Sequence, residues 1–264
     1  MQTLTSRTDL LAFIEKVRRA PERVLMLDYD GTLAPFHVDP ARAVPYPEVS
    51  VVLGEIIAAG GTRVVIVSGR PADEVPPLLG IEKRPEIWGS HGWERLFPDG
   101  RRVVEQAGAD ARAALADAAD RVSALLSEGA RLERKLASIA LHWRGLDVNV
   151  AARIAERAQA EWAPIASRGA VEILRFDCGL ELRAVGCNKQ YAVKAVLSEA
   201  PQESAIAYLG DDITDEDAFR AVGPRGLSVL VRPQVRETAA DVWIRPPDEL
   251  VAFLRHWVVK KHTV

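Results

Sequence analysis

Residues 24–32 read Val-Leu-Met-Leu-Asp-Tyr-Asp-Gly-Thr. Four consecutive apolar residues without polar alternation are typical of a strand that is buried on both faces, as in a parallel sheet. Two aspartates follow at once, and Gly31 then permits a tight turn. Because ligands of open α/β sheets bind at the carboxyl ends of the strands, this stretch predicts both a central strand and the edge at which a site lies.

The same apolar texture returns along the chain, separated by segments with helical periodicity. Further strands are predicted at 64–67, 87–88, 205–209, 229–231 and 242–244. Helices are predicted at 47–59, 71–79, 188–199, 215–222 and 247–258, and the capping pattern Ser6-x-x-Asp9 predicts an opening helix. Strands that alternate with helices predict an α/β fold with a doubly wound, Rossmann-like parallel sheet.

The stretch from about 103 to 183 breaks this rhythm. It is predicted to form a helix, two strands, a second helix and two more strands, at about 110–126, 131–143, 148–162 and 170–183. This αββαββ order predicts a separate α+β cap domain inserted into the core. We therefore expect a core of residues 1–102 and 184–264 and an inserted cap domain of residues 103–183.

Composition excludes several classes of function. The formal net charge is −3 with acidic and basic residues mixed, which argues against a nucleic-acid partner. Two cysteines, Cys178 and Cys187, are too few for a disulfide framework or a zinc site. No apolar stretch is long enough to span a membrane and no leader pattern is present, so we expect a cytoplasmic protein without a membrane partner.

Candidate site residues follow four of the predicted strands or open a predicted helix. They are Asp28, Asp30, Ser68, Gly69, Arg70, His91, Lys189, Asp211, Asp212 and Asp215. Each has a structural explanation when taken singly, because Asp-x-Asp occurs in solvated turns and Asp-rich turns cap helices. Their order, each at a strand or helix end, instead predicts one site at one edge of the sheet.

These residue types fit the cleavage of a phosphate monoester. A carboxylate cannot approach an anionic phosphate without charge neutralisation, which Mg²⁺ held by carboxylate oxygens supplies. The predicted ligands are Asp28, Asp211 and the main-chain carbonyl of Asp30, with Asp215 and Asp212 acting behind them or through water.

The catalytic roles follow from the same chemistry. Asp28 is the predicted nucleophile and forms an aspartyl-phosphate. Asp30 protonates the leaving oxygen and later activates the hydrolytic water. Ser68, the Gly69 amide and Lys189 hold the phosphoryl oxygens.

With these residues in hand, the sequence resembles the haloacid dehalogenase-like hydrolase superfamily, whose four motifs match residues 28–32, Ser68, Lys189 and 211–215. The second acid, Asp30, favours a phosphatase over a dehalogenase. Within the superfamily the chain is similar to trehalose-6-phosphate phosphatases over most of its length. The segments that carry this resemblance are 27–35, 67–70, 90–94, 141–144, 180–183 and, most specifically, Tyr-Leu-Gly-Asp-Asp-Ile-Thr-Asp-Glu-Asp-Ala-Phe at 208–219.

The resemblance implies a set of substrate contacts. These are Gly69 and Arg70 beside the phosphate, and the candidate sugar contacts His91, Glu94, His142, Arg144, Glu181 and Arg183. Structural alternatives exist, since the arginines could form surface ion pairs and His142 could be a structural histidine. Two positions depart from the family pattern: Ala184 stands where proline is usual, and Gln190 where glycine is usual.

The expected function is Mg²⁺-dependent hydrolysis of trehalose 6-phosphate, with a functional link to a trehalose-phosphate synthase. Three alternatives stay open. The substrate could be another sugar or glycoside phosphate, such as sucrose phosphate or glucosylglycerol phosphate. A phosphomutase would reuse the same aspartates, and a non-catalytic sugar-phosphate sensor would bind without turnover.

Overall fold

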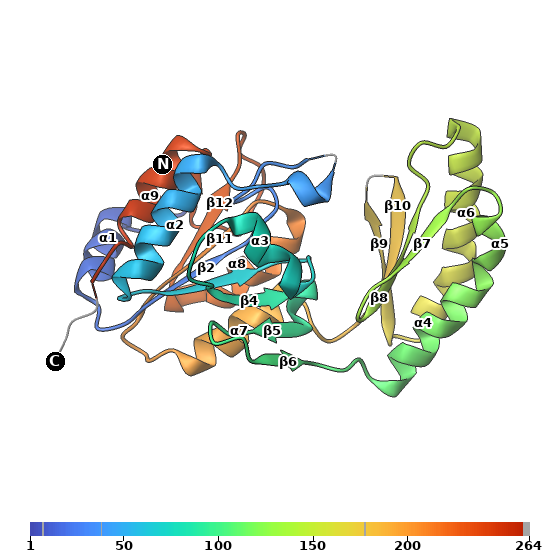
Figure 1. Cartoon of the computed structure of the whole chain (residues 1–264), viewed down its shortest axis with the longest axis horizontal. Coiled ribbons are helices and arrows are strands. Elements are labelled where there is room, and N and C mark those ends of the chain that lie inside the picture. Colours follow the sequence, from blue (N-terminus) through green and yellow to red (C-terminus); the bar gives the residue numbers. More distant parts are fainter. Residues whose placement is uncertain (7, 38, 177, 261–264) are drawn as a thin grey trace. The chain divides into compact units, whose positions relative to one another are not determined.

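The computed structural model describes residues 1–6, 8–37, 39–176 and 178–260 and divides the chain into two compact units (Figure 1). The core comprises Met1–Val104 and Asn188–Val264, and the cap comprises Glu105–Cys187. The predicted joins, 102/103 and 183/184, lie slightly earlier in the sequence. The difference arises because β6 (Arg102–Val104) pairs with β5 in the core sheet, and β10 (Gly179–Ala184) continues to Ala184 in the cap.

The core is built on one mixed sheet. Over the described residues it has nine strands in the order β1-β13-β12-β11-β2-β3-β4-β5-β6. The strands besides β6 are β1 (Gln2–Thr3), β2 (Arg23–Leu27), β3 (Arg63–Val67), β4 (Glu86–Gly89), β5 (Glu94–Leu96), β11 (Ala205–Gly210), β12 (Leu227–Val231) and β13 (Val242–Ile244). The strands from β13 to β4 are parallel, which confirms the predicted sheet. The antiparallel strands β1, β5 and β6 were not predicted.

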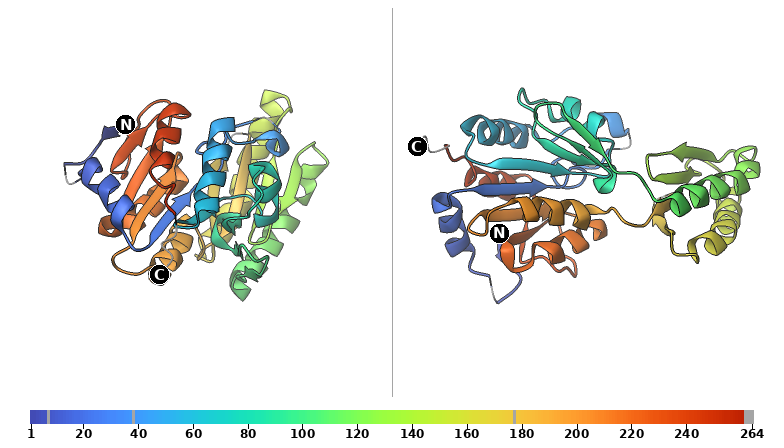
Figure 2. Two further views of the ribbon diagram at one scale, coloured as in Figure 1. Left: turned by 60° about the vertical axis from the view of Figure 1, so that its left-hand side comes forward. Right: turned by 90° about the horizontal axis from the view of Figure 1, so that it is seen from below.

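Helices cover both faces of this sheet (Figure 2). One face carries α1 (Leu10–Arg19), α2 (Pro47–Ala59), α3 (Val75–Leu79) and α9 (Asp248–Arg255); the other carries α7 (Lys189–Glu199) and α8 (Glu216–Val222). Alternate residues of β2 therefore enter different cores, Leu25 and Leu27 on one face and Val24 and Met26 on the other. This double burial is why the strand sequence shows no polar alternation.

Short 3-10 helices complete the core loops. They are η1 (Pro40–Arg42), η2 (Ala72–Glu74), η3 (Ser90–Gly92), η4 (Ile213–Asp215) and η5 (Gly223–Arg225). The opening helix α1 begins at Leu10, where the Asp9 side chain accepts a hydrogen bond from the Ala12 N–H at 2.9 Å. The N-cap is therefore Asp9, three residues after the predicted Ser6.

The strand order reverses next to β2. The chain moves outward through β2, β3 and β4, and later returns on the other side of β2 with β11, β12 and β13. In α/β sheets the crevice at such a switch point is the usual ligand site. The loops that follow β2 and β11 therefore meet at this position, and the N–H of Asp28 donates to the Leu209 carbonyl at 2.9 Å.

The cap is an antiparallel sheet with helices on one face. In the described part of residues 105–187 the strand order is β7-β8-β10-β9, with β7 (Arg131–Arg134), β8 (Ser138–His142) and β9 (Val171–Phe176). The helices are α4 (Ala109–Arg121), α5 (Ser123–Leu126) and α6 (Val148–Ala166). The Trp162 indole N–H donates to the Ala118 carbonyl at 3.0 Å and joins α6 to α4. Across both units, no described helix has the length and apolarity needed to cross a membrane.

An ion-pair network fixes the far end of α7. Both carboxylate oxygens of Glu199 accept from Arg95, at 2.6 and 2.8 Å, and one also accepts from Arg63 at 2.7 Å. The same arginines hold buried Glu86, at 2.9 Å from Arg63 and 2.8 Å from Arg95. Because these residues come from β3, β4, β5 and α7, the network ties the helix to the sheet.

We predict that Glu199→Gln lowers the melting temperature at pH 7 by about 1–3 °C. The hydrogen bonds from Arg95 and Arg63 hold the pKa of Glu199 at about 2, below its ordinary value of 4.5. A depressed acid pKa stabilises the fold above the unfolded-state value, and this contribution is lost as the pH falls from 4.5 towards 2. Scanning calorimetry should therefore show the deficit shrinking over this range. Exposed Glu55→Gln on α2 is the control, and an undiminished deficit near pH 2 would contradict the assignment.

Candidate active site

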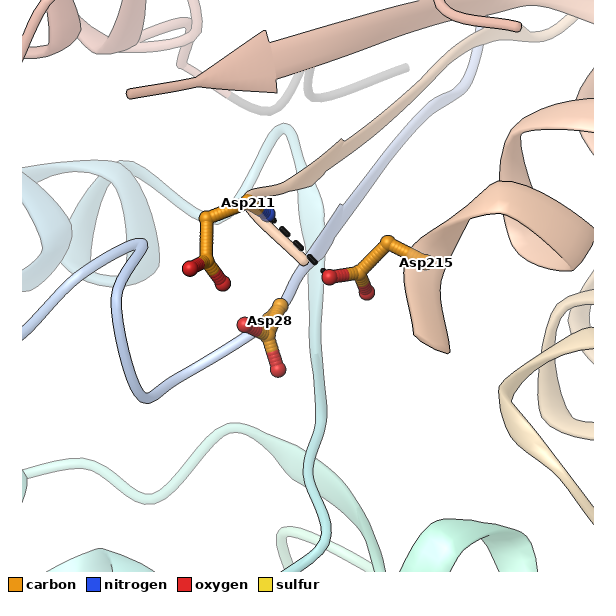
Figure 3. A group of neighbouring side chains, drawn as sticks. All are labelled: Asp28, Asp211 and Asp215. Atoms are coloured by element: carbon orange, nitrogen blue, oxygen red, sulfur yellow. Dashed lines mark hydrogen bonds between the residues drawn. The ribbon is translucent and has the colours of Figure 1, made fainter. Parts of the chain in front are cut away.

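Three buried carboxylates meet at the switch point of the sheet. Asp28 follows β2, Asp211 follows β11, and Asp215 ends η4. Among the described residues, these three can each offer one carboxylate oxygen such that the three atoms lie within 4.8 Å of one another. Figure 3 shows their side chains turned towards a common space. The loops after β2 and β11 thus meet as predicted, and their aspartate side chains lie close together.

Lys189 bridges two of these carboxylates. Its Nζ donates to Asp28 Oδ1 and to Asp215 Oδ1, both at 2.7 Å, and the side chain is 5% exposed. Burial alone lowers the pKa of a lysine, but here Asp215 and Asp28 outweigh burial and raise it, so Lys189 stays charged. Lys189 is also the first residue of α7, where the helix dipole opposes a cation, so the two carboxylates offset this cost as well.

Asp215 organises the turn after β11. Its Oδ1 accepts from Lys189 and from the hydroxyl of buried Tyr208 at 2.5 Å. Its Oδ2 accepts from the main-chain N–H groups of Asp211, at 3.1 Å, and Asp212, at 3.0 Å. A Cβ on Gly210 would come within 2.4 Å of the Asp215 carboxyl carbon, so this close approach requires glycine. Four hydrogen bonds therefore hold Asp215 behind the other two carboxylates.

The carboxylates of Asp28 and Asp211 accept fewer hydrogen bonds than that of Asp215. Thr32 Oγ1 donates to Asp28 Oδ2 at 3.1 Å, in addition to the contact from Lys189. Burial raises the pKa of both carboxyls well above 3.8, and mutual repulsion with the neighbouring aspartates adds to this effect. Gly31, at φ +84°, makes the close packing possible, because a Cβ there would lie 2.1 Å from Asp211 Oδ2.

Asp30 lies in a separate contact with Arg70. Arg70 Nε and Nη2 donate to Asp30 Oδ2 and Oδ1, each at 2.7 Å, in a bidentate pair. Arg70 Nη1 donates to the Pro40 carbonyl at 2.9 Å, and its guanidinium lies 5.4 Å from the centre of the Tyr29 ring. The Asp30 carboxylate is therefore oriented by an arginine that the Pro40 carbonyl and the Tyr29 ring also hold.

The loops after β3 and β4 support this pair. The N–H of Arg70 donates to Ser68 Oγ at 3.1 Å, and the N–H of His91 donates to the Ser68 carbonyl at 2.9 Å. A Cβ on Gly69 would lie 2.6 Å from the His91 ring, so His91 lies directly against Gly69. Buried Glu94 accepts from Ser90, Arg102 and the Ala72 N–H, which gives it a role in holding these loops.

Three of the four cap residues predicted from the sequence, His142, Glu181 and Arg183, share one face of the cap sheet. The register pairs Glu181 with Ala140, and Arg183 with Ser138, while Ile139, Leu141, Leu180 and Leu182 alternate with them and are buried. We call the face opposite to these buried residues the polar face. Its polar members are Ser138, His142, Glu172, Glu181 and Arg183, and Phe176 lies on it beside His142. Its contacts run across strands: Glu181 accepts from Ser138 Oγ at 2.6 Å, and Arg183 donates to Glu172 at 2.6 Å.

Comparison with known proteins identifies the chain's relatives. Residues 26–242 match the family model described as Trehalose-phosphatase. The chain belongs to the trehalose-phosphatase family. It is 33% identical over 248 residues to the trehalose-phosphate phosphatase of Mycobacterium ulcerans and 34% identical over 246 residues to that of Mycobacterium avium, covering 88% of this chain in each case. The chain spans only about 60% of the length of these curated relatives.

Solved structures of the family share the fold. The C-terminal domain of C. albicans trehalose-6-phosphate phosphatase aligns with a TM-score of 0.76 at 22% identity, covering 98% of this chain and 99% of that one. The Aspergillus fumigatus trehalose-6-phosphate phosphatase aligns with a TM-score of 0.69 at 25% identity, covering 95% and 97%. These alignments confirm the expected fold, an α/β core with an inserted cap.

Most of the predicted core residues fall into two connected groups in this trehalose-phosphatase family member. Asp28, Lys189, Asp211 and Asp215 form the first, and Asp30, Ser68, Gly69, Arg70 and His91 form the second. Asp212 is exposed and contributes a main-chain N–H rather than a carboxylate to the cluster. In the cap, Arg144 lies in the exposed turn after β8, and the His142 ring contacts Glu133 at 2.8 Å and Phe176.

Four contributors were not predicted from the sequence. Thr32 lies in the first motif, but its position alone does not indicate a role. Tyr208 has the sequence context of any aromatic residue in a buried strand. Lys135 and Ser138 hold Glu181, at 3.2 and 2.6 Å. Only the strand register brings Ser138 next to Glu181, so the sequence carries no local signal for it.

The donor set of the cluster suits a divalent cation. Three carboxylates and the single ammonium of Lys189 leave an excess of two formal negative charges in a buried space. Hard divalent cations prefer carboxylate oxygens, and a buried charge requires a partner. The residues present therefore fit a magnesium ion.

We predict that Asp211→Asn raises the melting temperature of chelator-treated protein by several degrees. Burial, with repulsion from Asp28 and Asp215, raises the pKa of Asp211 far above 3.8. For an acid whose pKa is raised in the fold, unfolding releases a proton, so stability falls as the pH rises from about 4 towards the raised value. The gap between variant and wild type should therefore widen from pH 5 to pH 8 in scanning calorimetry. Exposed Asp217→Asn should show no such widening, and a pH-independent gap would refute this prediction.

Proposed function

We propose that this chain hydrolyses trehalose 6-phosphate to trehalose and phosphate through an aspartyl-phosphate formed on Asp28, in a Mg²⁺-dependent reaction. The observation that carries the proposal is the Asp28 carboxylate, held by Lys189 within a cluster of buried acids in a chain of the trehalose-phosphatase family. The names of the mycobacterial relatives support the choice of substrate.

The metal would be held by carboxylate oxygens of Asp28 and Asp211 and by the main-chain carbonyl of Asp30, with Asp215 supporting them from behind. When bound, Mg²⁺ would neutralise negative charge on the phosphoryl oxygens and allow a carboxylate to approach them. Asp212, exposed at the start of η4, would act through water.

The chain's own residues would perform two displacements at phosphorus. An Asp28 oxygen forms a bond to phosphorus while the bond to the sugar oxygen breaks, and a proton from Asp30 goes to that oxygen. Water then attacks the aspartyl-phosphate, Asp30 takes its proton, and the carboxylate of Asp28 is restored. Lys189, Ser68 Oγ and the Gly69 N–H would hold the equatorial oxygens.

Arg70 would orient Asp30 for both proton transfers. Its bidentate contact, at 2.7 Å to each oxygen, fixes the plane of the carboxylate and leaves a second lone pair on each oxygen for the proton transfers. The charge of the guanidinium would also attract the anionic phosphate, in keeping with the predicted substrate contact of Arg70.

The polar face of the cap would recognise the sugar. It groups His142, Glu181 and Arg183, with Lys135 beside Glu181, and carbohydrate hydroxyls require such mixed donors and acceptors. Arg144 from the next turn, and His91 and Glu94 from the core, are further candidates. The carboxylate of Glu94 already accepts several hydrogen bonds, which favours a supporting role for it.

The two departures from the family pattern leave these groups intact. The N–H of Ala184 donates to the Ala137 carbonyl at 2.8 Å, a bond that a proline could not make, and its side chain is buried. Gln190 Nε2 points to the Asp217 carbonyl at 3.5 Å, on α8. Neither side chain belongs to the polar face.

The first experiment is phosphate release from a panel of sugar phosphates, with and without Mg²⁺. Trehalose 6-phosphate should be preferred, and Asp28→Asn should lower the rate by roughly a thousandfold or more because the nucleophile is lost. Asp99→Asn, in an exposed turn, is the matched control. Turnover of a different sugar phosphate would retain the mechanism and refute the substrate, and binding without release would indicate a sensor.

A second prediction separates sugar recognition from chemistry. Glu181→Gln should lower kcat/KM for trehalose 6-phosphate about tenfold or more, because it removes a charged acceptor from the polar face. The rate with p-nitrophenyl phosphate, which has no sugar, should stay within about twofold of wild type. Glu156→Gln, at an exposed position of α6, is the control. Equal losses with both substrates would show that Glu181 acts on stability or chemistry instead.

A further inference from the structure

Two arginines with no role in the proposed reaction contact the main chain of Asp211. Arg232 Nη1 donates to the Asp211 carbonyl at 3.1 Å, and Arg236 Nη2 lies 3.4 Å from the same oxygen. Both residues follow β12, the strand next to β11, and both are half-buried. A carbonyl at the edge of the acid cluster is thus capped by two guanidinium groups.

This capping completes the fixation of Asp211. Its N–H donates to Asp215 Oδ2 at 3.1 Å, so side chains hold the main chain on both sides of the residue. Asp211 lies beyond the last residue of β11, Gly210, where the strand ladder no longer determines its conformation. The direction of its buried carboxylate therefore depends on these hydrogen bonds.

The arginines are themselves anchored. The N–H of Arg232 donates to the Ile244 carbonyl at 3.1 Å, and its carbonyl accepts from the Trp243 indole at 2.9 Å. Arg236 Nη1 pairs with Glu216 on α8 and donates to the Glu237 carbonyl at 2.7 Å. The segment after β12 is thus bound to β13 and α8, which fixes the main chain that carries both donors.

We infer that Arg232 and Arg236 are positioning residues for Mg²⁺ binding, acting through the carbonyl of Asp211; this inference rests on the proposed function. They fix the main chain so that the Asp211 carboxylate stays directed at Asp28. Their positive charges also lower the cost of gathering three carboxylates in a buried space. Loss of such a supporting contact typically weakens metal binding without removing a ligand.

The test measures Mg²⁺ binding to the full chain by titration calorimetry, with no substrate present. The double variant Arg232→Ala/Arg236→Ala should raise the Kd for Mg²⁺ about tenfold to a hundredfold. The double lysine variant, which retains both charges and a donor at each position, should recover part of this loss. Glu216→Gln tests whether the ion pair of Arg236 accounts for the effect, and should leave most of the affinity intact.

Arg225 provides the matched control. It also donates to main-chain carbonyls, those of Ala200 and Pro201 at 3.2 Å each, but it precedes β12 instead of following it. Arg225→Ala should lower the melting temperature without changing the Kd for Mg²⁺. If the double alanine variant is unfolded, the double lysine variant and the two single variants carry the measurement.

The outcomes separate this inference from the proposed function. Wild-type Mg²⁺ affinity in a folded double variant would overturn the positioning role alone. An equal loss of affinity in Arg225→Ala would overturn it too, since the effect would then be one of general stability. Absence of Mg²⁺ binding in the wild-type chain would overturn the metal requirement, and the inference with it.

Discussion

The ammonium of Lys189 between the carboxylates of Asp28 and Asp215 is the contact on which the rest of the site depends. Three buried acids repel one another, and removing the cation would leave charges uncompensated in a low-dielectric space, at a cost of about 3–5 kcal/mol. The same contact fixes the start of α7 against β2 and η4. Lys189 therefore serves both the packing of α7 and the chemistry of the site, and its two contacts with the acids fix the position of the start of α7.

Much of the core could be predicted because double burial leaves a direct trace in sequence. Strands with helices on both faces must be apolar throughout, so β2, β3 and β11 appear as uninterrupted runs, and the polar residues that follow them mark the site. Strands β5 and β6 escaped prediction because each has only three residues, and β6, at the edge of the sheet, is exposed throughout. The N-cap is Asp9 and not the predicted Ser6. Either residue type can cap a helix, and the backbone conformation determines which of them does.

The parts of the site that depend on strand register or on main-chain contacts were harder to predict from the sequence. Residues two apart on a strand share a face, so Glu181 and Arg183 could be paired in advance, but their alignment with His142 and Ser138 follows from the β8–β10 register. Tyr208 has the sequence context of a core aromatic residue, and its hydroxyl contact with Asp215 follows from the fold alone. Arg232 and Arg236 contact a main-chain carbonyl. Because every residue has one, no side-chain motif in the sequence indicates these contacts.

Helix α7 makes remote parts of the core matter for catalysis. It spans residues Lys189–Glu199, and at 1.5 Å per residue it is about 16 Å long. One end carries the lysine of the acid cluster, and the other is held to the sheet by Arg63 and Arg95. The helix thus connects the acid cluster rigidly to the ion pairs at its far end. We therefore expect substitutions at the far end of α7, about 16 Å from the lysine along the helix, to alter the position of Lys189 and so the reaction rate.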